Sequence, residues 1–229
     1  MAKADLRIDW ATHEAAKYAC VNWHYSGCLP AGKLVKVGAW ESGKFIGVVL
    51  FGRGANNRMS SAYGLDQDQA CELVRIALTH HAAPVSRVAA MAMRFLHKQS
   101  PGLRLIISYA DPKQGHHGGI YQAGNWIYQG RSQAQRKLLI DGVFTHKRSA
   151  HAKYGTASPE RITAMSGRRV EWAPVEWKHV YLMPLDAEMR ERIIPLAKPY
   201  PKRAKQAMTD DQSAQRQGST DPHAPGVSK

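Results

Sequence analysis

The alternation of hydrophobic and polar residues predicts three strands in the N-terminal part of the chain. Two apolar runs, at residues 35–40 and 45–51, flank the polar segment 41–44, which contains a glycine. Apolar runs joined by so short a polar segment are typical of a β-hairpin. A third run, at residues 72–78, alternates well enough for a strand whose polar side includes Glu72.

A helix and a buried strand are predicted next. Pro84 suits the start of a helix, and the Pro101-Gly102 pair suits its end. The apolar residues between them recur at helical spacing: Val85, Val88, Ala89, Ala92, Phe95 and Leu96. The run at residues 103–109 is apolar and β-branched, so it predicts a buried strand that is followed by a short helix at residues 120–123.

The rest of the pattern predicts further strands and no second large domain. Residues 137–144 carry an Asp-Gly pair between apolar runs, residues 158–160 open a short helix, and residues 175–182 alternate like a half-buried strand. This order predicts an α/β (α+β) fold in which helices flank a central mixed, mostly antiparallel sheet. We expect one domain over residues 1–197 and a disordered basic and polar tail over 198–229, which is almost free of large apolar side chains.

The strongest bulk property is a net charge of +14, with a pI near 9.9. The tail holds six Lys or Arg and three Asp, so +11 belongs to residues 1–197. Such a charge favours nucleic acid or another polyanion as partner, although a basic surface can also serve solubility alone. The candidate phosphate contacts, several of them in the basic loop 146–154, are Arg53, Arg58, Lys147, Arg148, Lys153, Arg168 and Arg169. A solvated charged face is the alternative.

The sequence argues against a disulfide-rich, zinc-binding or membrane-spanning protein. The three cysteines, Cys20, Cys28 and Cys71, are too few and too irregularly spaced for a disulfide framework or a closed zinc site. No apolar run approaches the ~20 residues of a membrane span, and the first residues lack the apolar core of a signal peptide. We therefore expect a soluble protein in the cytoplasm.

Residues 108–126 have the composition of a binding site. This stretch places an Asp, two His, a Tyr and four Gly directly after the predicted buried strand. Carboxylates at strand ends lie on the rim of a sheet, where ligands bind, and glycines let a ligand approach the backbone. Asp111 and Tyr121 are expected to face one pocket. The alternative is that Asp111 only forms a turn before Pro112 and that the histidines are solvated.

Four motifs occur in order and together resemble the Mom proteins of Mu-like phages. They are residues 24–27 (HYSG), 52–57 (GRGANN), 72–77 (ELVRIA) and the stretch 111–126. The resemblance extends from about Trp23 to Tyr128 and, more weakly, to Leu182. It implies a GNAT-like acyltransferase fold, which the strand leading into the start of the helix at residues 82–87 also resembles. In that fold, backbone N–H groups at the helix start hold the pyrophosphate of an acyl-coenzyme A.

The resemblance implies an enzyme that modifies the exocyclic N6 amine of adenine in phage DNA and thereby protects it from host restriction. The adduct is of methylcarbamoyl or acetamido type, and the coenzyme is acetyl-CoA or a related acyl-CoA. The family's functional positions fall on His24, Tyr25, Arg75, Asp111 and Tyr121. Arg75 is expected to bind the coenzyme, and Ser86 and Arg87, in the first turn of the central helix, are further candidates.

Each catalytic candidate has an expected role. Asp111 accepts the N6 proton or binds the edge of the base, and Tyr121 protonates the leaving thiolate or binds the carbonyl oxygen. His24 suits a base or a metal ligand, and Tyr25 suits stacking or proton donation. An iron(II) site on His24 and Asp111 is compatible with what is suggested for the family, and His116 and His117 are further candidate ligands.

The expected partner is double-stranded DNA with a flipped-out adenine, because a base inside a duplex cannot present N6 to a buried acyl group. Trp23, Tyr109 or Trp126 are candidates to stack on that base. No membrane partner is expected, and a homodimer stays open. Two other functions compete: an ordinary GNAT N-acetyltransferase acting on a protein or small-molecule amine, and a non-catalytic DNA-binding protein with a degenerate transferase fold.

Overall fold

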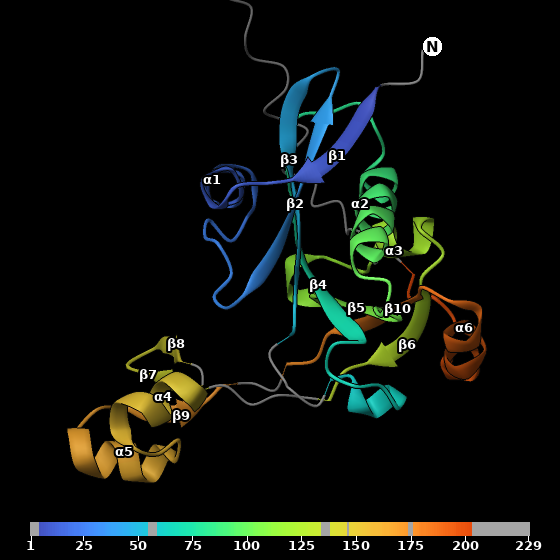
Figure 1. The fold of residues 1–229 in the computed structure, drawn as a ribbon. Coiled ribbons are helices and arrows are strands. Elements are labelled where there is room, and N and C mark those ends of the chain that lie inside the picture. The colour runs from blue at the N-terminus through green and yellow to red at the C-terminus, as the bar shows by residue number, and fades with distance from the viewer. Residues whose placement is uncertain (1–4, 55–58, 134–137, 146, 174–175, 203–229) are drawn as a thin grey trace, which may run out of the picture.

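The large sheet has seven strands in the order β1-β2-β3-β4-β5-β10-β6. Figure 1 shows it in the computed structural model, which describes residues 5–54, 59–133, 138–145, 147–173 and 176–202. The strands are β1 (Leu6–Trp10), β2 (Leu34–Glu41), β3 (Lys44–Gly52), β4 (Ala70–Leu78), β5 (Leu105–Ala110), β10 (His179–Pro184) and β6 (Ile127–Arg131). Neighbouring strands run antiparallel except β4 and β5, which are parallel. The prediction of a mixed, mostly antiparallel sheet flanked by helices is confirmed.

Helices cover both faces of this sheet (Figure 1). α1 (His13–Trp23) packs on one face through Cys20, against Val48 and Leu50 of β3. α2 (Val85–Gln99) packs on the other through Val88, and α3 (Gly119–Ala123) lies on the same side as α2. Alternate residues of β3 therefore point into two different cores, which explains why the strand is a continuous apolar run.

The two parallel strands separate at their carboxyl ends. β4 and β5 pair from Ala70 opposite Leu105 to Leu73 opposite Ser108. Beyond Leu73, β4 continues beside β3, and the register shift between these strands leaves Val74 as an extra residue, a β-bulge. A bulge bends its strand and increases the local twist. The sheet is thus split at the rim where the C-terminal ends of parallel strands commonly bind ligands.

Between β6 and β10 the chain forms a separate small unit, which we call the insertion (residues 138–172; Figure 1). Its sheet, in the order β8-β7-β9, is covered by two helices and has its own core of Leu138, Ile140, Ala150 and Ile162. The elements are β7 (Leu138–Ile140), β8 (Val143–Thr145), α4 (Lys147–Tyr154), α5 (Pro159–Ser166) and β9 (Val170–Trp172). The predicted Asp-Gly hairpin turn is confirmed, with positive φ at both residues.

The prediction of a basic loop over residues 146–154 is wrong over most of its length, because Lys147–Tyr154 is helix α4. Lys, Arg and Ala have good helix propensity, and Ala150 is fully buried in the core of the insertion. The burial of one small side chain per two turns leaves only a weak helical pattern in the sequence.

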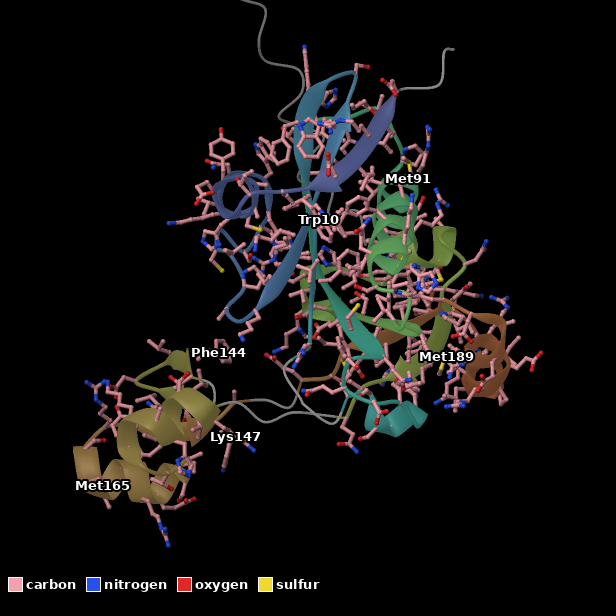
Figure 2. The ribbon with its side chains drawn as sticks, in the orientation of Figure 1. Trp10, Met91, Phe144, Lys147, Met165 and Met189 are labelled. Carbon is pink, nitrogen blue, oxygen red and sulfur yellow. The ribbon has the colours of Figure 1, made fainter. Side chains whose placement is uncertain are left out.

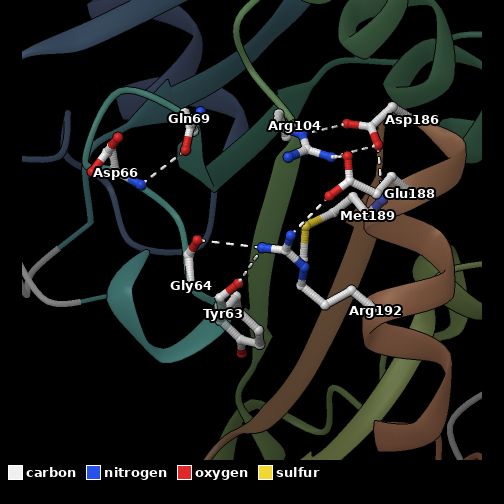
Figure 3. Close-up of polar contacts among 9 residues, drawn as sticks. All are labelled: Tyr63, Gly64, Asp66, Gln69, Arg104, Asp186, Glu188, Met189 and Arg192. Atoms are coloured by element: carbon white, nitrogen blue, oxygen red, sulfur yellow. Dashed lines mark hydrogen bonds and ion pairs between the residues drawn. The ribbon is translucent and has the colours of Figure 1, made fainter.

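A network of charged side chains fastens α6 (Ala187–Ile193) to the start of β5 (Figure 3). The Arg104 guanidinium binds the Asp186 carboxylate at 2.7 Å and the Glu188 carboxylate at 2.9 Å. Asp186 also caps the helix by accepting the Met189 N–H at 2.7 Å. Arg192 donates to the backbone carbonyls of Tyr63 and Gly64, at the end of the short 3₁₀ helix η1 (Ser61–Tyr63).

The described part of the segment predicted as a tail lies against β6. The Lys198 N–H donates to the Tyr128 carbonyl at 2.7 Å, and the Tyr200 hydroxyl donates to the Trp126 carbonyl at 2.6 Å. Residues 203–229 lie outside the described residues. Among the described helices, none is long and apolar enough to cross a membrane.

Candidate active site

A buried chain of hydroxyl groups leads from α3 to the split between β4 and β5. The Tyr121 hydroxyl lies 2.7 Å from the Ser108 Oγ, which lies 2.8 Å from the Leu73 carbonyl oxygen. Ser108 has one hydroxyl hydrogen, so donating it to Leu73 leaves Ser108 to accept the Tyr121 O–H. Leu73 and Ser108 are the last residues that pair β4 with β5, so this chain of hydrogen bonds ends at the split.

The environment of Tyr121 keeps its hydroxyl protonated. Burial raises the pKa of Tyr121 to about 12, and the nearby Glu72, Tyr25 and Tyr181 add to this increase. Its ring packs against Trp126 and Tyr181, with centroids 5.0 and 4.9 Å away. Tyr121 is therefore a fixed hydrogen-bond donor at neutral pH.

His24 and Tyr25 bring the end of α1 to the loop that follows β5. Their rings lie 4.1 Å apart, and the Tyr25 ring meets the His116 ring edge-on at 5.4 Å. Tyr25 is 62% exposed, whereas His24 is half-buried. Tyr121 belongs to α3, on the other face of the sheet from α1, so the candidate site draws on both faces around the split.

His24 is a neutral hydrogen-bond donor in this arrangement. Its Nδ1 accepts the Ser26 N–H at 3.2 Å and lies 2.9 Å from the Ser26 hydroxyl, which places the proton of the neutral ring on Nε2. Burial lowers the pKa of His24 to about 4, and the charges of Arg75 and His116 contribute. At neutral pH the ring presents an N–H from Nε2.

Arg75 lies beside His24 on the α1 face of the sheet. One terminal nitrogen of its guanidinium donates to the Cys28 carbonyl. Its Nε is buried and has no hydrogen-bond partner among the described residues. An orphaned buried donor is rare in folded proteins, and it is available to an acceptor oxygen of a bound molecule.

The start of α2 has the donor groups expected for an anion, but a carboxylate of the protein uses two of them. Glu41 accepts the backbone N–H groups of Ala82 and Ala83, each at 2.8 Å. These bonds lower the pKa of Glu41, as do the charges of His81 and Arg87. Ser86 and Arg87 stand in the first turn of α2, where the Arg87 N–H donates to the Pro84 carbonyl at 2.9 Å. They lie on the opposite face of the sheet from Arg75, so the three candidate coenzyme residues do not form one cluster.

Asp111 shapes the loop that carries His116. Its side chain caps the short 3₁₀ helix η2 (Pro112–Gln114) by accepting the Lys113 N–H at 3.0 Å, and its carbonyl accepts the His116 N–H at 3.1 Å. Within the described residues no hydrogen bond joins Asp111 to His24 or Tyr121. Its half-buried carboxylate stands at the end of β5, three residues after Ser108.

Tyr181 and Ser108 are contributors to the site that sequence reasoning missed. The Tyr181 hydroxyl donates to the His117 carbonyl at 2.6 Å, and Gln122 donates to the same carbonyl at 3.2 Å. Gly118 has φ +85°, and a Cβ there would lie 2.3 Å from the Tyr181 ring. Glycine is thus needed at position 118 for two reasons: its backbone adopts a positive φ, and any side chain would clash with the Tyr181 ring. The Gly-Gly pair at 118–119 was visible in the sequence, but its partner on β10 was not.

The residues proposed for iron do not fit a metal site. Among the described residues there is no group of three or more His, Cys, Asp and Glu placed to hold an ion. The Nδ1 of His24 is occupied by the Ser26 N–H, so its Nε2 carries the proton and has no free lone pair for a metal. The expectation of iron(II) on His24 and Asp111 therefore gains no support.

The candidate DNA contacts include two arginines in ion pairs and three exposed cations. Arg168 pairs with Asp141 at 2.9 Å and Arg169 with Glu171 at 3.3 Å. Arg53, Lys147 and Lys153 are exposed. Arg58 and the side chain of Arg148 lie outside what the structure describes. Of the aromatic candidates for stacking on a base, Trp126 is 1% exposed and belongs to the core, while Trp23 and Tyr109 are half-buried.

The split between β4 and β5 lies at the carboxyl ends of two parallel strands, a place where ligands commonly bind, and the Tyr121–Ser108 pair ends there. The chain belongs to the Mom protein family, whose profile matches residues 5–202. Curated proteins give no match.

Two solved structures are similar in outline. An acetyltransferase structure from Acinetobacter baylyi ADP1 has a TM-score of 0.41 and 12% identity, over 88% of this chain and 99% of that one. The AHL synthase LasI has a TM-score of 0.39 and 9% identity, over 87% of this chain and 100% of that one.

Proposed function

We propose that this Mom-family chain transfers the acyl group of an acyl-CoA to the N6 amine of adenine in DNA, giving an acetamido-type adduct that protects phage DNA from host restriction. A methylcarbamoyl adduct would need a nitrogen donor in addition, which the acyl-CoA does not supply. The observation that carries the proposal is the hydrogen-bond chain from Tyr121 through Ser108 to Leu73. It holds a protonated tyrosine at the split of the sheet. His24, from the other face of the sheet, would supply a second donor, and Asp111, at the end of β5, would supply a carboxylate.

The coenzyme supplies the acyl group as a reactive thioester. Ser86 and Arg87 would hold its pyrophosphate. The N–H groups of Ala82 and Ala83 would join them only if the pyrophosphate displaced the Glu41 carboxylate. The Glu41 carboxylate already rests on two of those N–H groups, which supports their affinity for an anion. Arg75, with its orphaned Nε, would bind an oxygen near the other face of the split.

The protein's own groups would manage the protons of the transfer. Adenine N6 is a weak nucleophile because its lone pair is delocalised into the ring, so it needs orientation and a proton acceptor. Asp111 would accept the N6 proton as the new C–N bond forms. The Nε2–H of His24 would stabilise the negative charge that develops on the carbonyl oxygen. Tyr121, whose O–H rests on Ser108 before the reaction, would turn this O–H to the leaving sulfur and donate its proton as the C–S bond breaks.

The DNA substrate would reach this site with its adenine out of the base stack. Tyr25, 62% exposed and ordered against His24 and His116, is the aromatic residue placed to stack on that base. Lys147 and Lys153, which are exposed on α4, would contact phosphates.

Nucleoside analysis of DNA from bacteria that express the chain tests this proposal. We expect a heavier deoxyadenosine by mass spectrometry, whose mass defines the added group. Asp111→Asn keeps an N-capping side chain, and Tyr121→Phe keeps the buried ring. Both should fold and bind DNA but modify adenine much more slowly than the parent, by about a hundredfold for Tyr121→Phe. Modification at the parental rate by either variant would show that its assigned role is wrong.

The same experiment separates the competing functions. Consumption of acetyl-CoA without any change in DNA would favour N-acetylation of a protein or small-molecule amine. Protection of DNA that survives loss of Asp111 and Tyr121 would favour a non-catalytic DNA-binding protein. DNA binding is measured separately. The double variant Lys147→Ala, Lys153→Ala should reduce the slope of the logarithm of the binding constant against the logarithm of the salt concentration by about one unit per lost phosphate contact. Because Arg168 and Arg169 are already paired, replacing them should have a smaller effect.

A further inference from the structure

Glu72 lies on the face of the sheet that α1 covers, one residue before the last pair of β4 and β5. It pairs with Gly52 of β3, two residues beyond Leu50, which packs against α1. It also pairs with Ile107 of β5, which shares a core with Met189 of α6 (Figure 2). Because alternate residues of a strand point to the same face, the Glu72 carboxylate stands on the α1 face, beside the split.

Tyr109 stands on the same face, two residues after Ile107 on β5, and is half-buried. Burial raises the pKa of Tyr109 and the charge of Glu72 adds to this increase, so the hydroxyl keeps its proton at neutral pH. Among the described residues no hydrogen bond engages this hydroxyl, whereas that of Tyr63, packed on the same core, donates to Gln129 at 2.6 Å. The split thus has an acceptor and a donor on neighbouring strands.

The backbone that follows β3 passes close to the Glu72 carboxylate. Gly54, with φ +75°, comes so near that a Cβ there would lie 3.1 Å from the Glu72 Oε2. An ionised carboxylate has about four lone-pair sites, so contacts within the protein leave room for a donor of a bound molecule. Glu72 is therefore a closely packed acceptor that can still receive a hydrogen bond from a ligand.

The donors assigned to the acyl carbonyl lie on this same face. Arg75 pairs with Leu50 of β3 and so points toward α1, and its charge helps to lower the pKa of His24 at the end of that helix, after the effect of burial. An amine that attacks a carbonyl held by His24 and Arg75 must arrive on the α1 face. Glu72 and Tyr109 are the polar residues of β4 and β5 that stand there beside the split.

We propose that Glu72 and Tyr109 recognise the target adenine by its edge, with Glu72 accepting one hydrogen of N6 and Tyr109 donating to a ring nitrogen. The inference rests on the proposed function and specifies how the same site selects its substrate. Adenine presents a donor amine beside acceptor nitrogens, which complements a carboxylate beside a hydroxyl. N6 carries two hydrogens, so Glu72 holds one while the other leaves to Asp111. Stacking on Tyr25 holds the plane of the base, and the edge contacts set its orientation.

Hypoxanthine, which carries an oxygen in place of the amine, distinguishes the two roles. The Glu72 carboxylate has only acceptor oxygens, so it repels this oxygen. A glutamine at position 72 can accept from N6 or, after its amide rotates, donate to the oxygen of hypoxanthine. Glu72→Gln should therefore bind hypoxanthine better than the parent does. The Tyr109 hydroxyl can donate or accept, so it contributes affinity for both bases and little discrimination between them.

The test measures the affinity of each full-length protein for a single strand of thymines that contains one adenine or one hypoxanthine. Fluorescence anisotropy is recorded at a salt concentration at which the all-thymine strand binds weakly. We expect the parent to prefer adenine about tenfold and Glu72→Gln to show a ratio near one. Glu14→Gln is the control, because Glu14 is exposed on α1 and its replacement changes the net charge equally. It should shift both affinities alike and keep the parental ratio.

A second pair of variants tests the hydroxyl donor. Tyr109→Phe should weaken binding of both strands about fivefold, the effect of one lost hydrogen bond. Tyr63→Phe removes a hydroxyl that Gln129 already engages, so it should bind both strands as the parent does. If Glu72→Gln fails to fold, as its urea midpoint would reveal, Tyr109→Phe decides the question.

Several outcomes would overturn this recognition. They are a parent without adenine preference, a preference that persists in Glu72→Gln or disappears in Glu14→Gln, and parental affinity in Tyr109→Phe. Mass spectrometry of the same strands separates recognition from the proposed function. Adenine preference that Glu72→Gln loses, without any adduct in the parent, means that the proposed function fails while the recognition stands. An adduct on adenine without that preference means the reverse.

Discussion

The Tyr121 hydroxyl and the Ser108 Oγ lie 2.7 Å apart in the buried interior, at the point where β4 and β5 separate. Ser108 donates to Leu73, so its remaining role toward Tyr121 is to accept. This geometry fixes the direction of the Tyr121 hydroxyl. It makes Ser108 a positioning residue for the proposed proton donor.

Ser108→Ala should lower kcat for adenine modification about tenfold, and Tyr121→Phe about a hundredfold. KM should change little in both, because neither hydroxyl is placed to contribute to DNA binding. The informative variant is the double substitution, since residues that act as one unit are not additive. We expect it to be no slower than Tyr121→Phe alone. A further tenfold loss in the double variant would mean that Ser108 acts independently of Tyr121.

His24 predicts a stability that depends on pH. Its pKa is about 4 in the folded protein, below its ordinary value of 6.5, so the unfolded chain binds the proton more readily. The contribution of neutral His24 to the free energy of unfolding is therefore fully present above pH 6.5 and is lost as the pH falls toward 4. His24→Gln keeps a side-chain N–H donor and removes the titration. Between about pH 7.5 and about pH 5, urea unfolding should show the parent losing about 1 kcal/mol more than His24→Gln. Parallel pH profiles for the two proteins would contradict the assignment.

Gly118 and Gly115 form a matched pair in the same loop. Both have positive φ, at +85° and +69°, but a Cβ at Gly118 would meet the Tyr181 ring at 2.3 Å while one at Gly115 would meet nothing within 4 Å. Gly115→Ala should cost about 1 kcal/mol, from backbone strain alone. Gly118→Ala should cost about 3 kcal/mol or more and should abolish modification, because it displaces the loop that carries His116. Equal urea midpoints for the two variants would show that Tyr181 does not clamp the loop.

The ion pair between Arg104 and Asp186 predicts a loss of stability in acid (Figure 3). Arg104 lowers the pKa of Asp186 from 3.8 to about 2, so the contribution is present above pH 3.8 and is lost as the pH falls toward 2. Asp186→Asn preserves an N-capping side chain and removes the charge. It should destabilise the protein by about 1 kcal/mol at neutral pH, after allowance for solvent screening.

A more exposed pair supplies the control for that substitution. Asp9 binds Arg7 at 2.9 Å, but their side chains are 50% and 59% exposed. Asp9→Asn should therefore change the unfolding midpoint less than Asp186→Asn. An Asp186→Asn protein that kept the parental stability at neutral pH and in acid would show that α6 is held by its apolar contacts alone.

Local pattern determined several elements of this protein without any tertiary information. The hairpin of β2 and β3, the strand β4, the helix α2 and the buried strand β5 follow from the spacing of apolar residues. The turn at Asp141 follows from the backbone that an Asp-Gly pair favours. The motifs around His24, Arg75 and Asp111 also sufficed to suggest the Mom family, to which the chain belongs.

Only the tertiary structure determined which residues from distant parts of the chain are in contact. β10 enters the sheet between β5 and β6, which brings Tyr181 against Gly118 across a long separation in sequence. The sequences of α1 and α4 show only a weak helical pattern, and these helices are stabilised because Cys20 and Ala150 are buried in hydrophobic cores. Burial by distant elements also lowers the pKa of His24 and keeps its ring neutral. The Ser26 N–H, which leaves the ring proton on Nε2, is in contrast a local contact. Sequence pattern reports periodicity within an element, whereas these contacts arise from the packing of elements that are distant in the chain.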